Sequence, residues 1–520
     1  MLRFTGHPIA DVGVATILVF SGKTEPEDLT PRDLEAVGRY LLQHYTRPWL
    51  NPYLSCLFPN SGYFQAYIQQ KTKGQISPKI ADEIESVLFG FRRSPEPKAQ
   101  GYRCVFSGQP ADRIVYRQHV PMITGENVLN FFPAGLGGMP IASPYLLAIQ
   151  AFPLGARRCE GRALAVHSDD PALTIAFASR ALQDNRRFLG LEAVKGEGDK
   201  YPDVKAPRSL ALDELVEIER RRQLPAEGTA APSVTVYHLT NSGRGPDLDI
   251  HHLPGQVVRF VQRALRDPYR QAFTALVAVS WEKPEQRPKK GGRRKGASAD
   301  KTGDTAWGPG KTRNRLYEDL FRLFSGLALL PDEARRFIGR HFLRRADVTA
   351  LCFNGSSPDE RQAIERQLRL VSWPLTELFI KEVMGMEKER IAAIRTVADR
   401  VADHIDRYND TKFYKRLFYH ARRYGEFRNL LLKASRERLR NREGPLVSFD
   451  EFLLAFEVPE GTSSAGWDLA RDLMLIRIID LLHERWGARI SEVMADEAAE
   501  DAESEEDEEP ALAGRRAGRY

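Results

Sequence analysis

Few residues of this chain are spaced so that they could hold a metal ion or transfer a proton. His251 and His252 closely follow Asp249, and these are residue types that ligate metals. Adjacent residues on a strand point to opposite faces, however, so the two imidazoles cannot easily chelate one ion. His7 and Asp11 fit a packing and hydrogen-bonding feature better than an acid–base pair. We therefore expect no catalytic residue and no metal site in either group.

Familiar catalytic motifs are also missing. The sequence has no Gly-x-x-x-x-Gly-Lys-Ser/Thr phosphate loop, no His-Glu-x-x-His metal helix and no Gly-x-Ser-x-Gly elbow. Its four cysteines are far apart and form no Cys-x-x-Cys pair, as is typical of a cytoplasmic protein without disulfides. No apolar stretch reaches the length of a membrane span. We expect a cytoplasmic protein that contacts no membrane, is not an enzyme and carries no cofactor.

The charge distribution favours an anionic partner. The formal net charge is +6, but ten acidic residues gather in Asp496–Glu509. Without that run and the three arginines that follow it, residues 1–495 carry +13. A basic body of this kind is typical of proteins that bind nucleic acid. The alternative is that Lys and Arg simply cover solvated faces.

Three loops have residue types suited to nucleic acid. Glycine lets one backbone approach another closely because it has no Cβ, and the first loop holds Gly135, Gly137 and Gly138. The second loop offers an amide, a hydroxyl and a guanidinium for phosphate or base-edge contacts. Its residues are Asn241, Ser242 and Arg244. The third loop could neutralise phosphates without reading bases, through Lys289, Lys290, Arg293, Arg294 and Lys295. A solvated loop is the alternative for each.

A fourth candidate region lies further along. Residues 386–443 contain sixteen Lys or Arg and nine Asp or Glu. We expect the basic residues, Arg422, Arg423 and Arg428 among them, to lie off the apolar stripe. Three aromatic residues are interleaved with them, namely Tyr419, Tyr424 and Phe427. A basic helical face with aromatic side chains can bind single-stranded DNA by charge and stacking.

The pattern of helix and strand signals predicts an α+β fold: a mixed N-terminal domain followed by a C-terminal α-helical bundle. Thr30, Pro31 and Asp33 form a helix start of the capping-box kind, and Ser77-Pro78 starts another helix. The alternating runs 162–167 and 233–238 predict strands, and 170–189 predicts a helix. Beyond Arg315, apolar residues at helical spacing predict several packed helices.

Four segments follow from these patterns and from composition. We expect an α+β body over 1–283, a basic flexible linker over 284–314, a helical bundle over 315–495 and an acidic disordered tail over 496–520.

Two blocks of sequence carry a family resemblance. The first is Phe4-Thr5-Gly6-His7-Pro8-Ile9-Ala10-Asp11-Val12-Gly13-Val14-Ala15-Thr16. The second is Tyr237-His238-Leu239-Thr240-Asn241-Ser242-Gly243-Arg244-Gly245-Pro246, followed by Ile250 and Leu253-Pro254. In this order and separation they resemble the large-subunit family of type I-B CRISPR Cascade complexes (the eighth Cas family, Cst-type branch). The resemblance covers roughly residues 1–480.

This resemblance implies a non-catalytic subunit for antiviral defence. Its partners would be the 5′ end of a guide RNA (crRNA), target double-stranded DNA with its displaced strand, the other Cascade backbone subunits and a helicase–nuclease. The Gly-rich loop would dock against the protospacer-adjacent motif. The C-terminal bundle would resemble a Cascade small subunit, and Met384 or Met386 could start it as a separate product of about 135 residues.

One departure from the family concerns zinc. Cys104-Val105-Phe106-Ser107-Gly108 looks like a zinc-knuckle turn whose second cysteine is serine, and the matching stretch 141–148 has no cysteine. Tetrahedral zinc needs four ligands, so we expect a knuckle-shaped turn held by packing and no metal. Three alternative functions remain: a transposon-associated Cascade in which transposition proteins are the partners, an unrecognised nucleic-acid-modifying enzyme, and a regulatory or scaffold protein.

Overall fold

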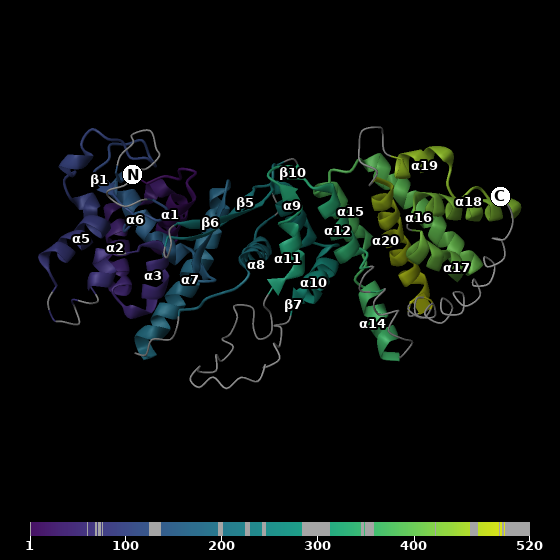
Figure 1. The fold of residues 1–520 in the computed structure, drawn as a ribbon, viewed down its shortest axis with the longest axis horizontal. Coiled ribbons are helices and arrows are strands. Elements are labelled where there is room, and N and C mark those ends of the chain that lie inside the picture. Colours follow the sequence, from purple (N-terminus) through teal and green to yellow (C-terminus); the bar gives the residue numbers. More distant parts are fainter. Residues whose placement is uncertain are drawn as a thin grey trace, which may run out of the picture. The chain divides into compact units, whose positions relative to one another are not determined.

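The fold was obtained as a computed structural model of the 520-residue chain. It describes residues 2–59, 61–67, 70, 74, 76–123, 137–195, 201–223, 229–241, 246–282, 313–344, 348, 358–421, 423–457, 466–487, 489–490 and 493. The chain forms two compact units, coloured along the sequence in Figure 1. The first unit comprises Met1–Arg259 and Trp281–Phe321, and the second comprises Phe260–Ser280 and Arg322–Tyr520.

The first unit combines helices with a small antiparallel sheet. Its helices are α1 (Pro8–Ser21), α2 (Pro31–Tyr45), α3 (Asn51–Leu57), α5 (Pro78–Phe89), α6 (Ser143–Ala151), α7 (Pro171–Lys195), α8 (Pro207–Glu219) and α11 (Arg315–Leu320), while α9 (Gly255–Ala264) contains the boundary with the second unit. The sheet has the order β3 (Arg157–Cys159), β4 (Arg162–Ser168), β5 (Val234–Thr240) and β6 (Asp247–Leu253). Two shorter pairs join β1 (Arg113–Val115) to β2 (Met139–Ile141) and β7 (Trp281–Glu282) to β8 (Arg313–Asn314).

Two helices begin at the residues that the sequence predicts, and one of them has the predicted cap. The Thr30 side chain accepts a hydrogen bond from the Asp33 amide, and the Asp33 carboxylate accepts one from the Thr30 amide, so the predicted capping box is confirmed. One face of α2 then buries Leu34, Val37 and Leu41. The predicted helix at Ser77-Pro78 is α5, although the Ser77 side chain makes no capping hydrogen bond.

The central strands confirm the predicted alternating runs. β4 pairs with β5 so that Val166 faces Val236, and β5 pairs with β6 so that Val236 faces His251. The helices α1, α3 and α7 all pack against β4, and α1 also packs along α6 and α7. The core of this unit therefore forms where α1 meets α6, α7 and the sheet, and it includes Val14, Ile17 and Leu147.

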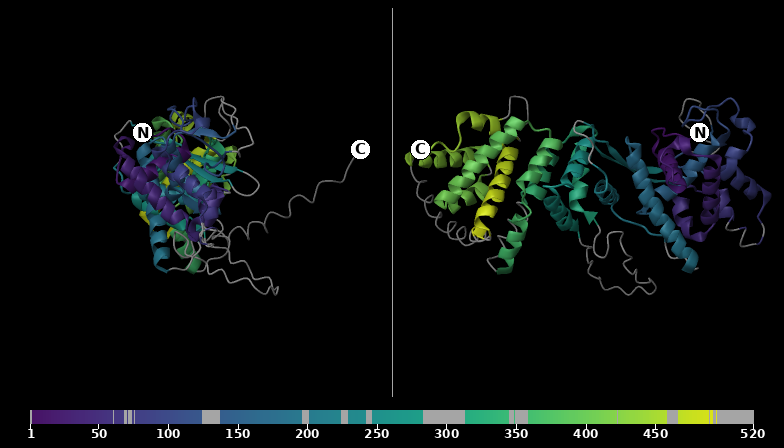
Figure 2. Two further views of the ribbon diagram at one scale, coloured as in Figure 1. Left: turned by 90° about the vertical axis from the view of Figure 1, so that its left-hand side faces the viewer. Right: turned by 180° about the vertical axis from the view of Figure 1, so that it is seen from behind.

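The second unit is almost wholly helical. Its helices are α10 (Arg270–Val279), α12 (Pro331–Phe337), α14 (Pro358–Leu368), α15 (Trp373–Glu382), α16 (Lys388–Tyr408), α17 (Thr411–Lys415), α18 (Tyr424–Arg440), α19 (Phe449–Phe456) and α20 (Gly466–Trp486). It also holds the short strand pair β9 (Phe324–Ser325) and β10 (Ala328–Leu329). The long helices α16 and α20 lie against each other, and α19 packs on both (Figure 2).

The architecture is therefore α+β with a C-terminal helical region, as predicted. Apolar stripes such as Ile394, Val401 and Ile405 on α16 are buried, because their spacing places them on one face. The expected linker, apart from its last two residues, and the expected acidic tail lie outside the described residues. The boundaries drawn there remain predictions.

Candidate nucleic-acid interface

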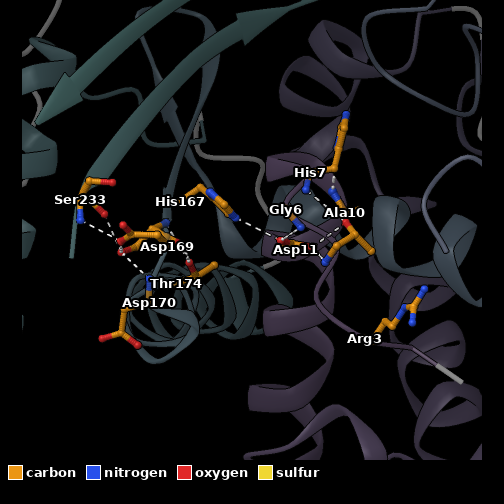
Figure 3. A network of polar contacts seen from close by, with 12 residues as sticks. Arg3, Gly6, His7, Ala10, Asp11, His167, Asp169, Asp170, Thr174 and Ser233 are labelled. Carbon is orange, nitrogen blue, oxygen red and sulfur yellow. Dashed lines mark hydrogen bonds and ion pairs between the residues drawn. The ribbon is translucent and has the colours of Figure 1, made fainter. Parts of the chain in front are cut away.

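A polar network ties the first sequence block to the sheet (Figure 3). Asp11 lies in the first turn of α1 and is only 2% exposed. Its carboxylate accepts hydrogen bonds from the Thr5 amide at 2.7 Å, the Thr5 hydroxyl at 2.9 Å and the Gly6 amide at 2.8 Å. On the other side, Nε2 of His167 on β4 lies 3.1 Å from Oδ2 of Asp11. The side chain thus fastens the N-terminal segment and α1 to the central sheet.

The electrostatics of this network favour the charged form of the Asp11 carboxylate. Burial alone would raise the pKa of Asp11, but the hydrogen bonds from His167, Thr5 and Gly6 outweigh it and hold the pKa below its usual value. Burial lowers the pKa of His7 despite the attraction of Asp11. A carboxylate with this many donors has little capacity left to accept a proton from a substrate. The predicted hydrogen-bonding feature is confirmed.

The same strand connects the two sequence blocks. β4 contacts α1 of the first block and pairs along its length with β5, whose C-terminal half carries the second block. Polar contacts also secure the opposite end of β4, where the Ser168 amide donates to the Thr174 hydroxyl and the Ser233 amide donates to Asp169 (Figure 3). Segments more than 200 residues apart in sequence therefore lie within one packed unit.

Asn241 occupies a buried structural position rather than the expected surface one. It is 0% exposed, and its backbone amide donates to the Cys56 carbonyl at 2.6 Å. Its side-chain amide faces the Leu57 carbonyl at 3.5 Å, and its own carbonyl accepts from Arg117 at 2.9 Å. The expectation that this side chain contacts nucleic acid is therefore corrected, because it anchors the end of β5 to α3. Its predicted companions Ser242 and Arg244 lie outside the described residues.

Gly138 of the Gly-rich loop is buried and packs against neighbouring side chains of the protein. Gly138 has φ +95°, and a Cβ on it would lie 2.6 Å from the Tyr116 ring and 2.7 Å from Ile114. The close approach predicted for this residue exists, but it is to neighbouring side chains of the same unit. Gly137 is half-buried, and Gly135 lies outside the described residues.

The basic face of α18 is the predicted region that the structure describes best. Arg423, just before the helix, and Arg428 are both exposed, as predicted. Arg428, Lys433, Arg436 and Arg440 are exposed and fall within roughly 140° of the helix surface at 100° per residue. Arg422 and the whole basic cluster Lys289, Lys290, Arg293, Arg294 and Lys295 lie outside the described residues.

Of the three aromatic residues expected to stack on bases, Phe427 lies in the core, whereas Tyr419 and Tyr424 are half-buried. Phe427 is 0% exposed and packs against Phe456 and Trp467. Tyr424 also contacts the Trp467 ring, and its hydroxyl donates to Glu457 at 3.0 Å. Phe427 falls on the apolar stripe of α18, so its place in the core was implied by its spacing. The stacking expectation is therefore corrected for Phe427. The exposed surface of α18 carries its arginines and lysine together with Leu432 and Leu439.

The predicted knuckle-shaped turn is present. The Gly108 amide donates to the Cys104 carbonyl at 2.8 Å, and the Cys104 amide donates to the Gln109 carbonyl at 2.7 Å. Phe106 packs edge-on against His7 and stacks on Tyr145. Aromatic packing holds the turn to the N-terminus of α1 and to α6.

The two adjacent histidines on β6 separate as predicted. His251 Nδ1 faces Nε of Arg208 at 3.3 Å, whereas His252 Nδ1 faces the Thr235 hydroxyl at 3.0 Å. They do not converge on one point.

A different cluster of possible metal ligands lies in the second unit and has no sequence motif. His404, Asp410 and Glu437 in the second unit bring their side-chain donor atoms within 4.8 Å of one another. These residues are six and twenty-seven positions apart and belong to no recurrent metal-binding pattern. Only the folding of α18 against the end of α16 brings them together, so no sequence signal could have found them.

Comparisons with known proteins add no family. No protein-family model, no curated protein and no solved structure matches this chain. In the part of the chain that the structure describes, every helix is too short or too polar to cross a membrane.

Proposed function

We propose that the chain is the non-catalytic large subunit of a type I-B CRISPR Cascade complex. In this role it binds the 5′ end of the guide RNA, probes the protospacer-adjacent motif of target DNA and helps to recruit the helicase–nuclease. Base pairing by the guide supplies sequence specificity, while the protein reads a short motif and the backbone.

The observation that carries the proposal is the convergence of the two blocks. Both lie in one unit, on α1 and on β5, and both pack against β4. The Asp11 carboxylate of the first block and the Asn241 backbone amide of the second are both engaged within the protein. Blocks with such internal roles fit a family signature that preserves a scaffold rather than a reaction centre.

The charge of the second unit supports a contact with nucleic acid. Exposed arginine and lysine on α18 can pair with phosphates and release counterions, which binds DNA without regard to sequence. This contact suits the displaced strand, which has to be held whatever its sequence.

Binding of target DNA by the assembled complex tests the proposal. A complex reconstituted from the guide RNA and the backbone subunits should bind correctly flanked target duplex only when this chain is present. Arg428→Gln combined with Arg436→Gln should weaken binding to matched and mismatched targets alike. It should also flatten the dependence of log K on log salt by roughly 0.7–0.9 for each phosphate that the variant no longer neutralises.

The matched control is Arg395→Gln combined with Arg407→Gln on α16, since both arginines are exposed and pair with carboxylates of the same unit. It removes the same charge and should change the salt dependence less. Target binding that is the same with and without this chain would contradict the proposal, as would metal-dependent DNA cleavage by the isolated chain.

A further inference from the structure

We propose that His404, Asp410 and Glu437 form a binding site for one divalent transition-metal ion, which fastens α18 to the end of α16. The site lies wholly in the second unit and is independent of the function proposed above.

The three side chains come from three different helices of the bundle or their caps. His404 lies in the last turns of α16, Asp410 is the N-cap residue of α17 and Glu437 projects from α18. Their donor atoms all lie within 4.8 Å of one another, and Nε2 of His404 is 4.0 Å from Oδ2 of Asp410. Together with Tyr408 and Thr411 they line one surface pocket.

His404 supplies the observation that points to a ligand. Its side chain is only 2% exposed, yet neither Nδ1 nor Nε2 has a hydrogen-bond partner among the described residues. The rings of Tyr408 and Phe413 hold the imidazole in place, at centroid distances of 4.9 and 5.7 Å. A buried polar group without a partner is costly, so an imidazole placed this way fits a site that something else completes.

The two carboxylates are arranged to complete it. Oδ1 of Asp410 accepts the Phe413 amide at 2.9 Å as the cap of α17, which leaves Oδ2 on the His404 side. Fixing one oxygen by a backbone amide orients the other, as outer contacts do for the ligands of metal sites. Glu437 is exposed and can turn inward without disturbing the core.

The donor set selects the class of metal. One imidazole nitrogen and two carboxylate oxygens suit Zn²⁺ and similar divalent transition metals, with water in a remaining position. Tetrahedral donors around Zn²⁺ lie about 3.4 Å apart, given metal–ligand distances near 2.1 Å. The present separations therefore need to close by little more than 1 Å.

Two nearby positive charges oppose a cation. Lys412 also lines the pocket, but its side chain is exposed and can direct its ammonium group into solvent. Arg438 acts on His404 as well, but its guanidinium pairs with Glu443 at 3.1 Å. Two carboxylates against one movable lysine then leave a net negative site.

Binding of Zn²⁺ alone to the full-length chain tests this inference. After treatment with EDTA and its removal, calorimetric titration should show one Zn²⁺ ion per chain, and Zn²⁺ should raise the melting temperature. Glu437→Gln and Asp410→Asn should each weaken the affinity at least tenfold, because losing even an outer partner of a ligand costs about 10–100-fold. Substituting Co²⁺ should give visible absorption bands that both variants lose.

Glu389→Gln is the matched control, because it removes an exposed carboxylate at the other end of α16. It should bind Zn²⁺ like the wild type. Since Glu437 is exposed, Glu437→Gln should melt at the wild-type temperature in EDTA, which separates metal binding from folding. Failure of the wild type to bind Zn²⁺, or unchanged affinity in Glu437→Gln, would overturn the proposal.

Discussion

Asp11 shows how one buried side chain can organise the start of a protein. Its two carboxylate oxygens take donors from the Thr5 and Gly6 backbone and from the imidazole of β4. Hydrogen bonds to a charged group are each worth about 1.5–3 kcal/mol, and a donor left without an acceptor in the interior costs more. Asp11 therefore stabilises the fold because both of its carboxylate oxygens accept hydrogen bonds.

Asp11→Asn should lower the free energy of unfolding by about 2 kcal/mol or more, because the amide nitrogen turns a donor toward a donor. Urea denaturation of the two proteins measures the difference. Asp28→Asn, at an exposed position in a short helical turn, is the control and should stay within about 0.5 kcal/mol of the wild type. A loss for Asp11→Asn no larger than that of the control would contradict the assigned role.

His251 should make the stability depend on pH. Burial, then the nearby Arg208, lowers its pKa to about 4 in the folded protein, against an ordinary value of 6.5. The unfolded chain therefore binds a proton between these values that the folded chain does not, so stability falls as pH drops from 6.5 toward 4. His251→Gln should reduce the loss of melting temperature between pH 7 and pH 5. An identical loss in both proteins would refute this cause.

The placement of single residues could be predicted where backbone geometry fixes the direction of the side chain. It could not be predicted where the placement depends on which parts of the chain are buried. The opposite faces of His251 and His252 follow from strand geometry and were predictable. Asn241 and Gly138 have types common in exposed turns, yet both pack against distant parts of the chain. Nothing in the residue type separates a turn that faces solvent from one that faces its own core.

At the scale of elements, the crossing of α1 and α6 depends on a glycine. A Cβ on Gly13 would lie 2.0 Å from the Ala148 carbonyl oxygen of α6. With a larger residue at this position, α1 and α6 would have to move apart. Because α1 also contacts α7 and β4, that movement would disturb their packing too. This close approach gives a physical reason for a glycine within the first sequence block.

Gly13→Ala should therefore destabilise the protein by about 1–3 kcal/mol, the usual cost of overpacking, although alanine is the better helix former. The control is Gly190→Ala on α7, where a Cβ meets nothing within 4 Å. That change should stabilise by about 0.5–1 kcal/mol. Melting temperatures that move in the same direction for both variants would contradict the packing argument.

Local signals predicted the elements well. The capping box at Thr30 and Asp33, the strand alternation in 162–167 and the apolar stripes of α16 and α20 each depend on residues close in sequence. The short pairs β1–β2 and β7–β8 were not predicted, because strands of two or three residues leave too few positions for a period to show.

At the scale of the whole molecule, the chain passes between its two units more often than the composition indicates. Phe260–Ser280 belongs to the helical unit, while Trp281–Phe321 returns to the first. Composition shifts locate a change of class along the chain, but they cannot locate a segment that packs with distant residues. The helical character of the second unit was predictable from sequence. Which segments of the chain belong to that unit was not.

The sequence predicts that the helices from α16 to α20 are also made as a separate product, although α20 also packs on α15. Met384 and Met386 lie in the connection between α15 and α16, and α16, α19 and α20 pack on one another. We expect a C-terminal product of about 15 kDa in cells that express the wild-type gene. Changing both methionines to Leu should remove it and leave the full-length chain folded, since side-chain volume is nearly conserved. Mass spectrometry decides this, and persistence of the product in the double variant would disprove the start site.

Sequencing the RNA that copurifies with the tagged chain from its native cells decides whether the chain is a Cascade subunit. We expect short RNAs of uniform length, each with a repeat-derived 5′ handle followed by a spacer, together with the backbone subunits of the complex. The RNA should remain after a high-salt wash, because it is enclosed in an assembly rather than held by phosphate contacts alone. Recovery of the chain without such RNA, or with cellular RNA of no common 5′ sequence, would contradict its assignment as a Cascade subunit.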